Sequence, residues 1–367
     1  MEALITLWIA IIGLCVGSFL NVVIGRLPED DDLDVPEPKD WWERWKLSFR
    51  FSGRAYKRLA WPPSRCPKCK RALPWYENIP VFSWLALRGK CRGCKEPISP
   101  RYILVELLTG TLFVAASARF PFDWQLVSAL TFLTFLIPLI FIDAERWILP
   151  FELTLPGILG GVLLAIPLGP AVFQGAVIGA VAAFLIFRVM EFFGWLVTGR
   201  EALGAGDKYL LAMIGAQVGW RGLLGVILFS SLQGAVVGLV RMRLTGRAGP
   251  PTSETPPTED QTKPEAEVEE EAPKREPFTP EFTKPGLAWW KRLLAIPYTI
   301  FLQDIPDSPP PDESTGEIPD WVPQANNIPF GPWIGLAGIE VMMLGPFIVE
   351  KFAHTQWQLL TEIVFGR

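Results

Sequence analysis

Long apolar runs alternate with short polar turns along most of this chain, a pattern typical of helices that cross a membrane. A span needs about 20 apolar residues, and a helix satisfies its own backbone hydrogen bonds there. The run at residues 209–219 is shorter than that, so it must be tilted or continuous with residues 204–208. Eight helices are predicted, at residues 4–24, 102–119, 124–142, 151–168, 171–197, 209–219, 223–240 and 332–352.

The composition favours the same class, since 50% of the residues are hydrophobic and only 20% are charged. The first run lacks a basic leader and a small-residue cleavage site, so we expect it to stay as a helix. In it, Gly13, Gly17 and Ser18 allow close contact with another helix, and Asn21 is expected to hydrogen-bond a neighbouring helix. The net charge of −4 decides little, because the charges are unevenly spread.

The distribution of basic residues predicts the orientation. Residues 26–101 hold 17 Lys or Arg against 10 Asp or Glu, which places this loop in the cytoplasm and the N-terminus outside. Threading the later runs from there puts the turns near 143–150, 198–206 and 241–247 in the cytoplasm as well. Asp143 and Asp207 are therefore expected on the same, cytoplasmic, side of the membrane.

One long polar segment interrupts the helices. Residues 249–328 carry 16 acidic and 6 basic residues among many prolines, and we expect most of this segment to be disordered. Within it, residues 287–302 are predicted as an interfacial helix, as is Trp41–Lys46 earlier in the chain. The predicted organisation is a first helix (1–25), a cytoplasmic domain (26–101), a transmembrane core (102–248), the acidic insertion (249–327) and a C-terminal helix and tail (328–367).

Four of the five cysteines form two CxxC pairs, and these predict a metal site: Cys66, Cys69, Cys91 and Cys94. Four thiolates from two tight turns suit tetrahedral zinc, and such a site is structural because it leaves no position for water. Disulfides are disfavoured in a cytoplasmic loop. We interpret Cys15 as a packing residue, and the single histidine, His354, as a helix-end residue rather than a ligand. No internal repeat is evident.

Two aspartates stand at the ends of apolar runs. Asp143 closes one run, and Asp207 follows Gly204 and Gly206 at the mouth of another. Ionisable groups at membrane depth often mark functional sites, and two carboxylates that share a proton can hydrolyse a peptide bond with one as base and the other as acid. An aspartate at a helix terminus can also be a cap. From the residues alone, catalysis and capping both remain open.

The chain resembles the bacterial prepilin leader peptidases, which are GxGD intramembrane aspartyl proteases. The resemblance covers nearly the whole chain outside the insertion. It is carried by both CxxC pairs and by these segments: Gly17–Ile24 with Arg26–Pro28, Glu77–Pro80, Ser83–Leu85, Leu87–Gly89, Ile98–Ser99, Arg101–Tyr102, Val105–Leu108, Ile142–Asp143 with Leu149–Pro150, Gly204–Asp207 and Ile328–Pro332.

This resemblance implies a bacterial inner-membrane enzyme that removes the basic leader of type IV prepilins or type II secretion pseudopilins. It makes Asp143 and Asp207 the catalytic aspartates and the four cysteines zinc ligands. It also implies N-methylation of the new N-terminus with S-adenosylmethionine, although we assign no residue to that cofactor. The expected partners are the prepilin and membrane lipid, without nucleic acid, and no oligomeric state is predicted. A peptidase without methyltransferase activity and a zinc-bearing membrane scaffold are the alternatives.

Three departures from the family pattern stand out. The lysine usual two residues after the second aspartate is Tyr209 here, with Lys208 beside the aspartate instead. Phe151 follows Pro150 where Asp or Asn is usual. The acidic insertion is not typical of the family.

Overall fold

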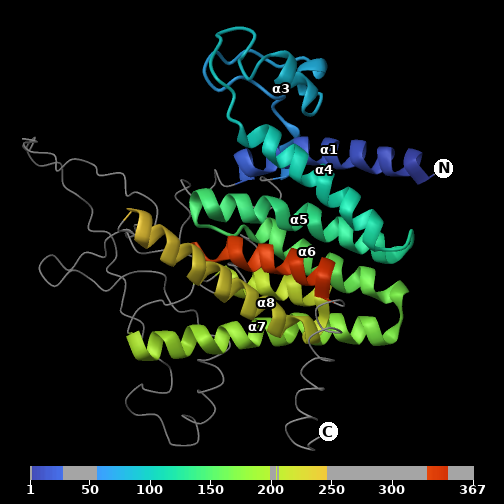
Figure 1. Ribbon diagram of the computed structural model, residues 1–367, viewed down its shortest axis with the longest axis vertical. Coiled ribbons are helices and arrows are strands. Elements are labelled where there is room, and N and C mark those ends of the chain that lie inside the picture. Colours follow the sequence, from blue (N-terminus) through green and yellow to red (C-terminus); the bar gives the residue numbers. More distant parts are fainter. Residues whose placement is uncertain (1, 28–55, 199–203, 205, 246–328, 346–367) are drawn as a thin grey trace, which may run out of the picture. The chain divides into compact units, whose positions relative to one another are not determined.

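The structure is a computed structural model that describes residues 2–27, 56–198, 204, 206–245 and 329–345 (Figure 1). These residues fall into two compact units. Of the described residues, the first unit contains 2–27, 56–183, 209–230 and 331–345, and the second contains 184–198, 204, 206–208, 231–245, 329 and 330. Several predictions lie outside the described residues, namely the helix at Trp41–Lys46, the acidic insertion with its segment 287–302, and His354.

The described residues are mainly helical and contain no strand longer than an isolated bridge, which confirms the all-α prediction. Six of their helices are long and apolar enough to cross a membrane, and a shorter apolar helix spans Gly331–Gly345. The long helices are α1 (Glu2–Arg26), α4 (Arg101–Arg119), α5 (Trp124–Arg146), α6 (Phe151–Ala165, continued by η3, Ile166–Leu168), α7 (Pro170–Thr198) and α8 (Asp207–Thr245). Two short elements, η2 (Trp75–Asn78) and α3 (Phe82–Ala86), lie between α1 and α4.

Helix α8 joins two of the predicted helices. The runs 209–219 and 223–240 form one element that begins at Asp207 and contains a single non-helical residue, Gly219, with φ 71° and ψ 171°. Glycine alone adopts such a backbone without steric cost. The two predicted runs are thus two helical segments that meet at a kink at Gly219, where the first predicted run ends.

In the first unit, α1 and α4 are neighbours (Figure 1), and they pack against each other through small residues. A Cβ on Gly13 would lie 2.9 Å from the Cα of Gly110, and one on Gly17 would lie 2.8 Å from the Cα of Glu106. Asn21 donates a hydrogen bond from Nδ2 to the Tyr102 carbonyl at 3.0 Å. The predicted roles of these α1 residues are confirmed.

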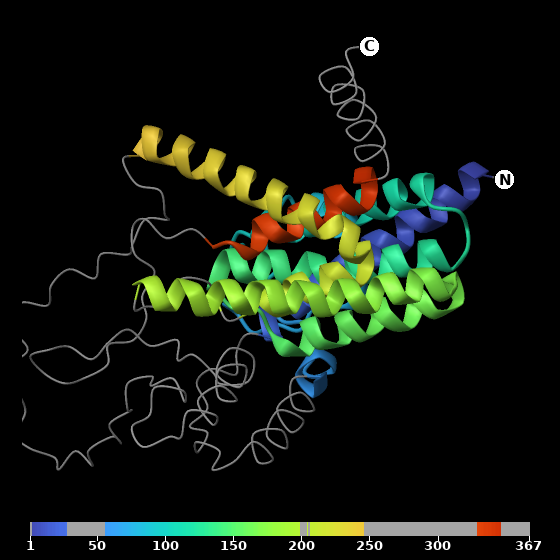
Figure 2. The same ribbon diagram turned by 90° about the horizontal axis from the view of Figure 1, so that it is seen from below.

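The other helices of this unit also meet at glycines. A Cβ on Gly179 of α7 would overlap the carbonyl oxygen of Gly215 on α8, so the two backbones touch there. The helix Gly331–Gly345, red in Figures 1 and 2, packs Gly335 against Ile140 of α5 and Gly338 against Ile214 of α8. Close backbone approach at small residues is how membrane helices associate where lipid offers no hydrophobic driving force.

Candidate active site and metal centre

The two CxxC pairs sit in two turns with the same backbone hydrogen bonds. The N–H of Cys66 bonds the carbonyl of Arg71, and the N–H of Cys91 bonds that of Glu96. Each turn is closed by an isolated antiparallel bridge, Arg65 with Ala72 and Lys90 with Pro97. Residues 65–72 and 90–97 therefore form a small structural repeat, although the sequence analysis found none. Too few side chains recur for the sequence to reveal it.

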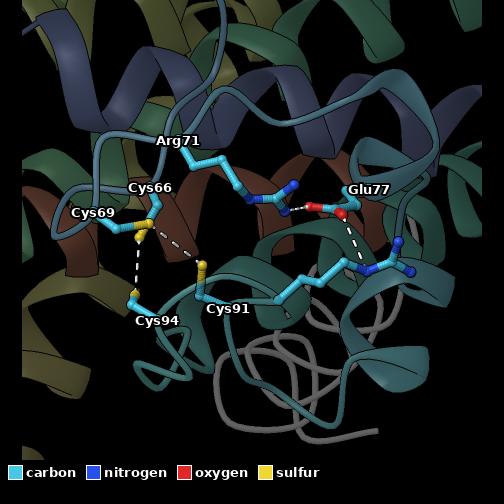
Figure 3. A network of polar contacts seen from close by, with 7 residues as sticks. Cys66, Cys69, Arg71, Glu77, Cys91 and Cys94 are labelled. Atoms are coloured by element: carbon cyan, nitrogen blue, oxygen red, sulfur yellow. Dashed lines mark hydrogen bonds and ion pairs between the residues drawn. The ribbon is translucent and has the colours of Figure 1, made fainter.

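The structure brings the four predicted metal ligands together. The Sγ atoms of Cys66 and Cys94 are 3.8 Å apart, those of Cys69 and Cys91 are 4.0 Å apart, and all four lie within 4.8 Å of one another. A tetrahedral zinc with Zn–S bonds of roughly 2.3 Å separates its sulfurs by about 3.8 Å. Figure 3 shows the thiols converging from both turns. The donor set and its spacing thus suit a four-thiolate zinc ion.

Backbone amides prepare the first cysteine of each pair to ionise. The N–H of Cys69 lowers the pKa of the Cys66 thiol, and the N–H of Cys94 lowers the pKa of Cys91 to about 6. Although the N–H of Glu96 favours the thiolate of Cys94, desolvation and the neighbouring thiols raise the pKa of Cys94 to about 11. The metal-free cluster therefore retains protons that a divalent cation would displace.

A buried carboxylate links the two turns. Glu77, in η2, forms ion pairs with two arginines (Figure 3). One is Arg71, which follows the first cysteine pair. The other is Arg92, which lies between the two cysteines of the second pair, with its Nε 3.4 Å from Oε1 of Glu77. The Glu77 side chain is 2% exposed. A carboxylate removed from water and shared by two guanidinium groups fixes both turns relative to each other. Glu77 thereby supports the geometry of the thiols without contacting the metal position.

Asp143 occupies the last turn of α5 and is buried. Its Oδ2 atom has no hydrogen-bond partner among the described residues. The backbone of Gly331 lies against this carboxylate so closely that a Cβ there would come within 2.5 Å of Oδ2. Gly331 begins the helix Gly331–Gly345, and the positive end of that helix dipole faces the carboxylate. Among the described residues, Oδ2 of this buried carboxylate therefore has no hydrogen-bond partner and lies against the Gly331 backbone.

Asp207 belongs to the second unit and is also buried. It opens α8, and its N–H donates to the Gly204 carbonyl at 3.0 Å. A Cβ on Gly204 would lie 3.4 Å from Oδ2. Both predicted aspartates are thus buried carboxylates, each beside a glycine.

Three further charged residues are buried in the second unit. Arg188 and Glu191 lie near the end of α7, and Lys208 lies in the first turn of α8. Arg188 donates to Oε2 of Glu191 at 2.9 Å, and the Lys208 ammonium lies 3.1 Å from both carboxylate oxygens. This cluster ties the first turn of α8, and hence Asp207, to α7. The lysine beside the aspartate therefore has a defined ion-pair role.

The two aromatic departures from the family pattern are in contact. The rings of Phe151 and Tyr209 meet edge to face with centroids 4.6 Å apart. By the resemblance, a carboxylate or amide and a lysine would usually occupy these positions. The two positions that depart from the family pattern are thus in contact with each other.

Four residues with defined contacts in the structure had no individual role assigned from the sequence: Glu77, Glu106, Glu191 and Gly331. Glu106 and Glu191 lie inside apolar runs, so the rule that charged residues at membrane depth have partners could have found them. Glu77 stands in a polar loop, and Gly331 meets Asp143 only through the fold. Both lie in segments that carry the family resemblance, which marks the segments but not these contacts.

Comparison with known proteins matches both halves of this architecture. Residues 11–120 match the family model of the bacterial peptidase A24 N-terminal domain, and residues 130–239 match that of the type IV leader peptidase family. The first range includes the four cysteines, and the second includes both aspartates. These features define a membrane peptidase with an appended cysteine-rich domain.

Curated relatives extend the match. A prepilin leader peptidase/N-methyltransferase of Myxococcus xanthus (strain DK1622) is 49% identical over 347 residues, which cover 94% of this chain and 92% of the relative. Proteins of the same name from Aeromonas hydrophila and Stutzerimonas stutzeri are each 42% identical, over 62% and 64% of this chain and 77% and 80% of their own lengths. No solved structure matches. The chain belongs to the type IV leader peptidase family.

The different extents of these matches bear on the insertion. The alignment with the Myxococcus relative covers 94% of this chain. The part of the chain outside that alignment is shorter than residues 249–327, so the relative shares most of this segment. The insertion is therefore a feature of a part of the family and not of this chain alone.

Proposed function

We propose that this protein is a membrane aspartyl peptidase that removes the basic leader from type IV prepilins or type II secretion pseudopilins, and then methylates the new N-terminal amine. The observation that carries the peptidase is the pair of buried carboxylates, Asp143 and Asp207, each beside a glycine at the end of an apolar helix. The relatives' shared name supports both activities and the choice of substrate.

In the proposed reaction the two aspartates share one proton. The ionised carboxylate takes a proton from water as its oxygen attacks the scissile carbonyl carbon, and the protonated carboxyl hydrogen-bonds the carbonyl oxygen. A proton then passes to the leaving nitrogen as the C–N bond breaks. The glycine backbone at residues 204 and 331 lies close to each carboxylate, as a residue without a side chain allows.

The four cysteines would hold a structural zinc ion, because their thiols already have the spacing of a tetrahedral site. Bound there, zinc would cross-link the two turns, and a site closed by four thiolates would leave no position for a hydrolytic water. We assign S-adenosylmethionine as methyl donor from the family alone and place no residue against it.

The orientation proposed here has the N-terminus outside and both aspartates at the cytoplasmic face. A prepilin joins a basic leader to an apolar helix, so its cleavage site lies at the cytoplasmic interface, where the charge bias of the loops puts Asp143 and Asp207.

The test uses purified full-length protein in lipid vesicles with a prepilin and labelled S-adenosylmethionine. We expect a shortened pilin that carries label on its N-terminus. Cleavage without label would reduce the function to a peptidase, and an uncut prepilin would favour the zinc-bearing scaffold.

A further inference from the structure

The cytoplasmic loop between α1 and α4 presents large apolar side chains to its surroundings. Trp75 of η2 is 79% exposed, and Phe82 and Leu85 of α3 are 67% and 57% exposed. Phe82 and Leu85 are three residues apart and share one face of α3, and α3 packs against η2. We call these three residues the α3 face. A water-soluble domain rarely exposes such a group without a partner.

The fold holds α3 level with a membrane-crossing helix. The N–H of Val81, which directly precedes α3, donates to Oε2 of Glu106 at 2.7 Å. Glu106 lies five residues inside α4, so this anchor is about 7.5 Å along the helix from Arg101 at 1.5 Å per residue. Val81 has φ 60°, which is strained for a β-branched residue. The hydrogen bond to the buried Glu106 carboxylate holds this backbone and ties the start of α3 to the first turns of α4.

The segment that carries the α3 face is strongly basic. Residues 56–100 carry 10 Lys or Arg and only 2 acidic residues. Both acidic residues are paired within this segment, Glu77 with Arg71 and Arg92, and Glu96 with Lys68. The remaining basic side chains give this segment a large positive charge, which attracts anionic surfaces and repels basic ones.

We propose that the α3 face inserts into the headgroup layer of the bilayer and that the basic side chains around it bind anionic lipid headgroups. Tryptophan and phenylalanine beside clustered Lys and Arg are the composition of an interfacial membrane anchor. A basic prepilin leader is repelled by the same charge, so it is not the occupant. The inference rests on the membrane position of α4 and not on peptidase activity.

The experiment places a photoreactive residue on this face in the full-length protein. p-Benzoylphenylalanine replaces Phe82 or, separately, Leu85, and the protein is reconstituted in nanodiscs of phosphatidylcholine with a minor fraction of phosphatidylglycerol. The control carries the same residue at Lys68, an exposed position of the first cysteine turn whose side chain is 66% exposed. Zinc content shows that each variant is folded, and mass spectrometry identifies the photoproducts.

Lipid adducts at positions 82 and 85 and none at position 68 are expected, with phosphatidylglycerol enriched at least about twofold over its mole fraction. Adducts to a second copy of the chain, adducts to added prepilin, or no adduct at either position in zinc-loaded protein would each overturn the proposal. Lipid adducts without that enrichment would overturn its anionic-lipid part.

Discussion

Replacing Glu191 with glutamine is expected to destabilise the protein more than replacing Lys208 with methionine, although the two side chains form one ion pair. The Glu191 carboxylate serves two buried cations, with Arg188 at 2.9 Å and Lys208 at 3.1 Å. Without its charge, both cations lose this anion in a buried setting, which costs about 3 to 5 kcal/mol. Without Lys208, the carboxylate keeps Arg188, and the loss is that of a charged hydrogen bond, about 1.5 to 3 kcal/mol.

The assay is reversible unfolding of each variant in mixed detergent and denaturing micelles. Glu145→Gln is the matched control, because Glu145 pairs with Arg101 at 2.6 Å but both side chains are partly exposed. Such a pair contributes about 1 kcal/mol or less. Equal losses for the Glu191 and Glu145 variants, or a larger loss for Lys208→Met, would refute the reasoning that Glu191 is the centre of a buried cluster.

Further predictions concern packing and the metal centre. Gly179→Ala should strongly lower thermal stability, because a Cβ there overlaps the α8 backbone. Gly175→Ala should not, because its Cβ position has open space around it. Equal effects of the two substitutions on thermal stability would contradict the packing of α7 against α8. Glu77→Gln should speed the loss of zinc to a chelator, because Glu77 joins the two cysteine turns through Arg71 and Arg92. An unchanged rate of zinc loss would exclude this role of Glu77. Because the pKa of Cys91 is lowered from 9.0 to about 6, its thiolate should stabilise metal-free protein fully above pH 9, with that stabilisation lost as the pH falls through about 6. Unfolding of metal-free wild type and Cys91→Ser protein across this range tests that prediction, which fails if both respond alike.

The sequence predicted the helices well because membrane spans leave a strong signal. Every apolar run longer than about 18 residues in the described part is a helix, and the cysteine pairs converge as their spacing implied. What the pattern missed depends on the fold. Gly331 meets Asp143 across nearly two hundred residues, and Lys208 finds its anion on α7. The break at Gly219 falls where the predicted run 209–219 ends, although its backbone angles could not be read from the sequence.

Contacts also changed the meaning of single residues. Tyr209 and Phe151 looked like two unrelated departures from the family pattern, yet their rings form one contact. Val81 and Glu106 are ordinary residues in the sequence, and only the structure joins them into an anchor for α3. Sequence patterns indicate periodicity and the chemistry of residues at a fixed spacing. Contacts between residues on distant elements are seen only in the folded structure.

The central claim is that Asp143 and Asp207 together hydrolyse the prepilin, and it is tested most directly by cleavage kinetics of Asp143→Asn and Asp207→Asn in vesicles. Asparagine keeps the size of the side chain and removes the titrating carboxyl. With zinc content and membrane insertion unchanged, each variant should cleave about 10²- to 10⁴-fold more slowly than wild type. Cleavage at the wild-type rate by either properly inserted variant would contradict the assignment.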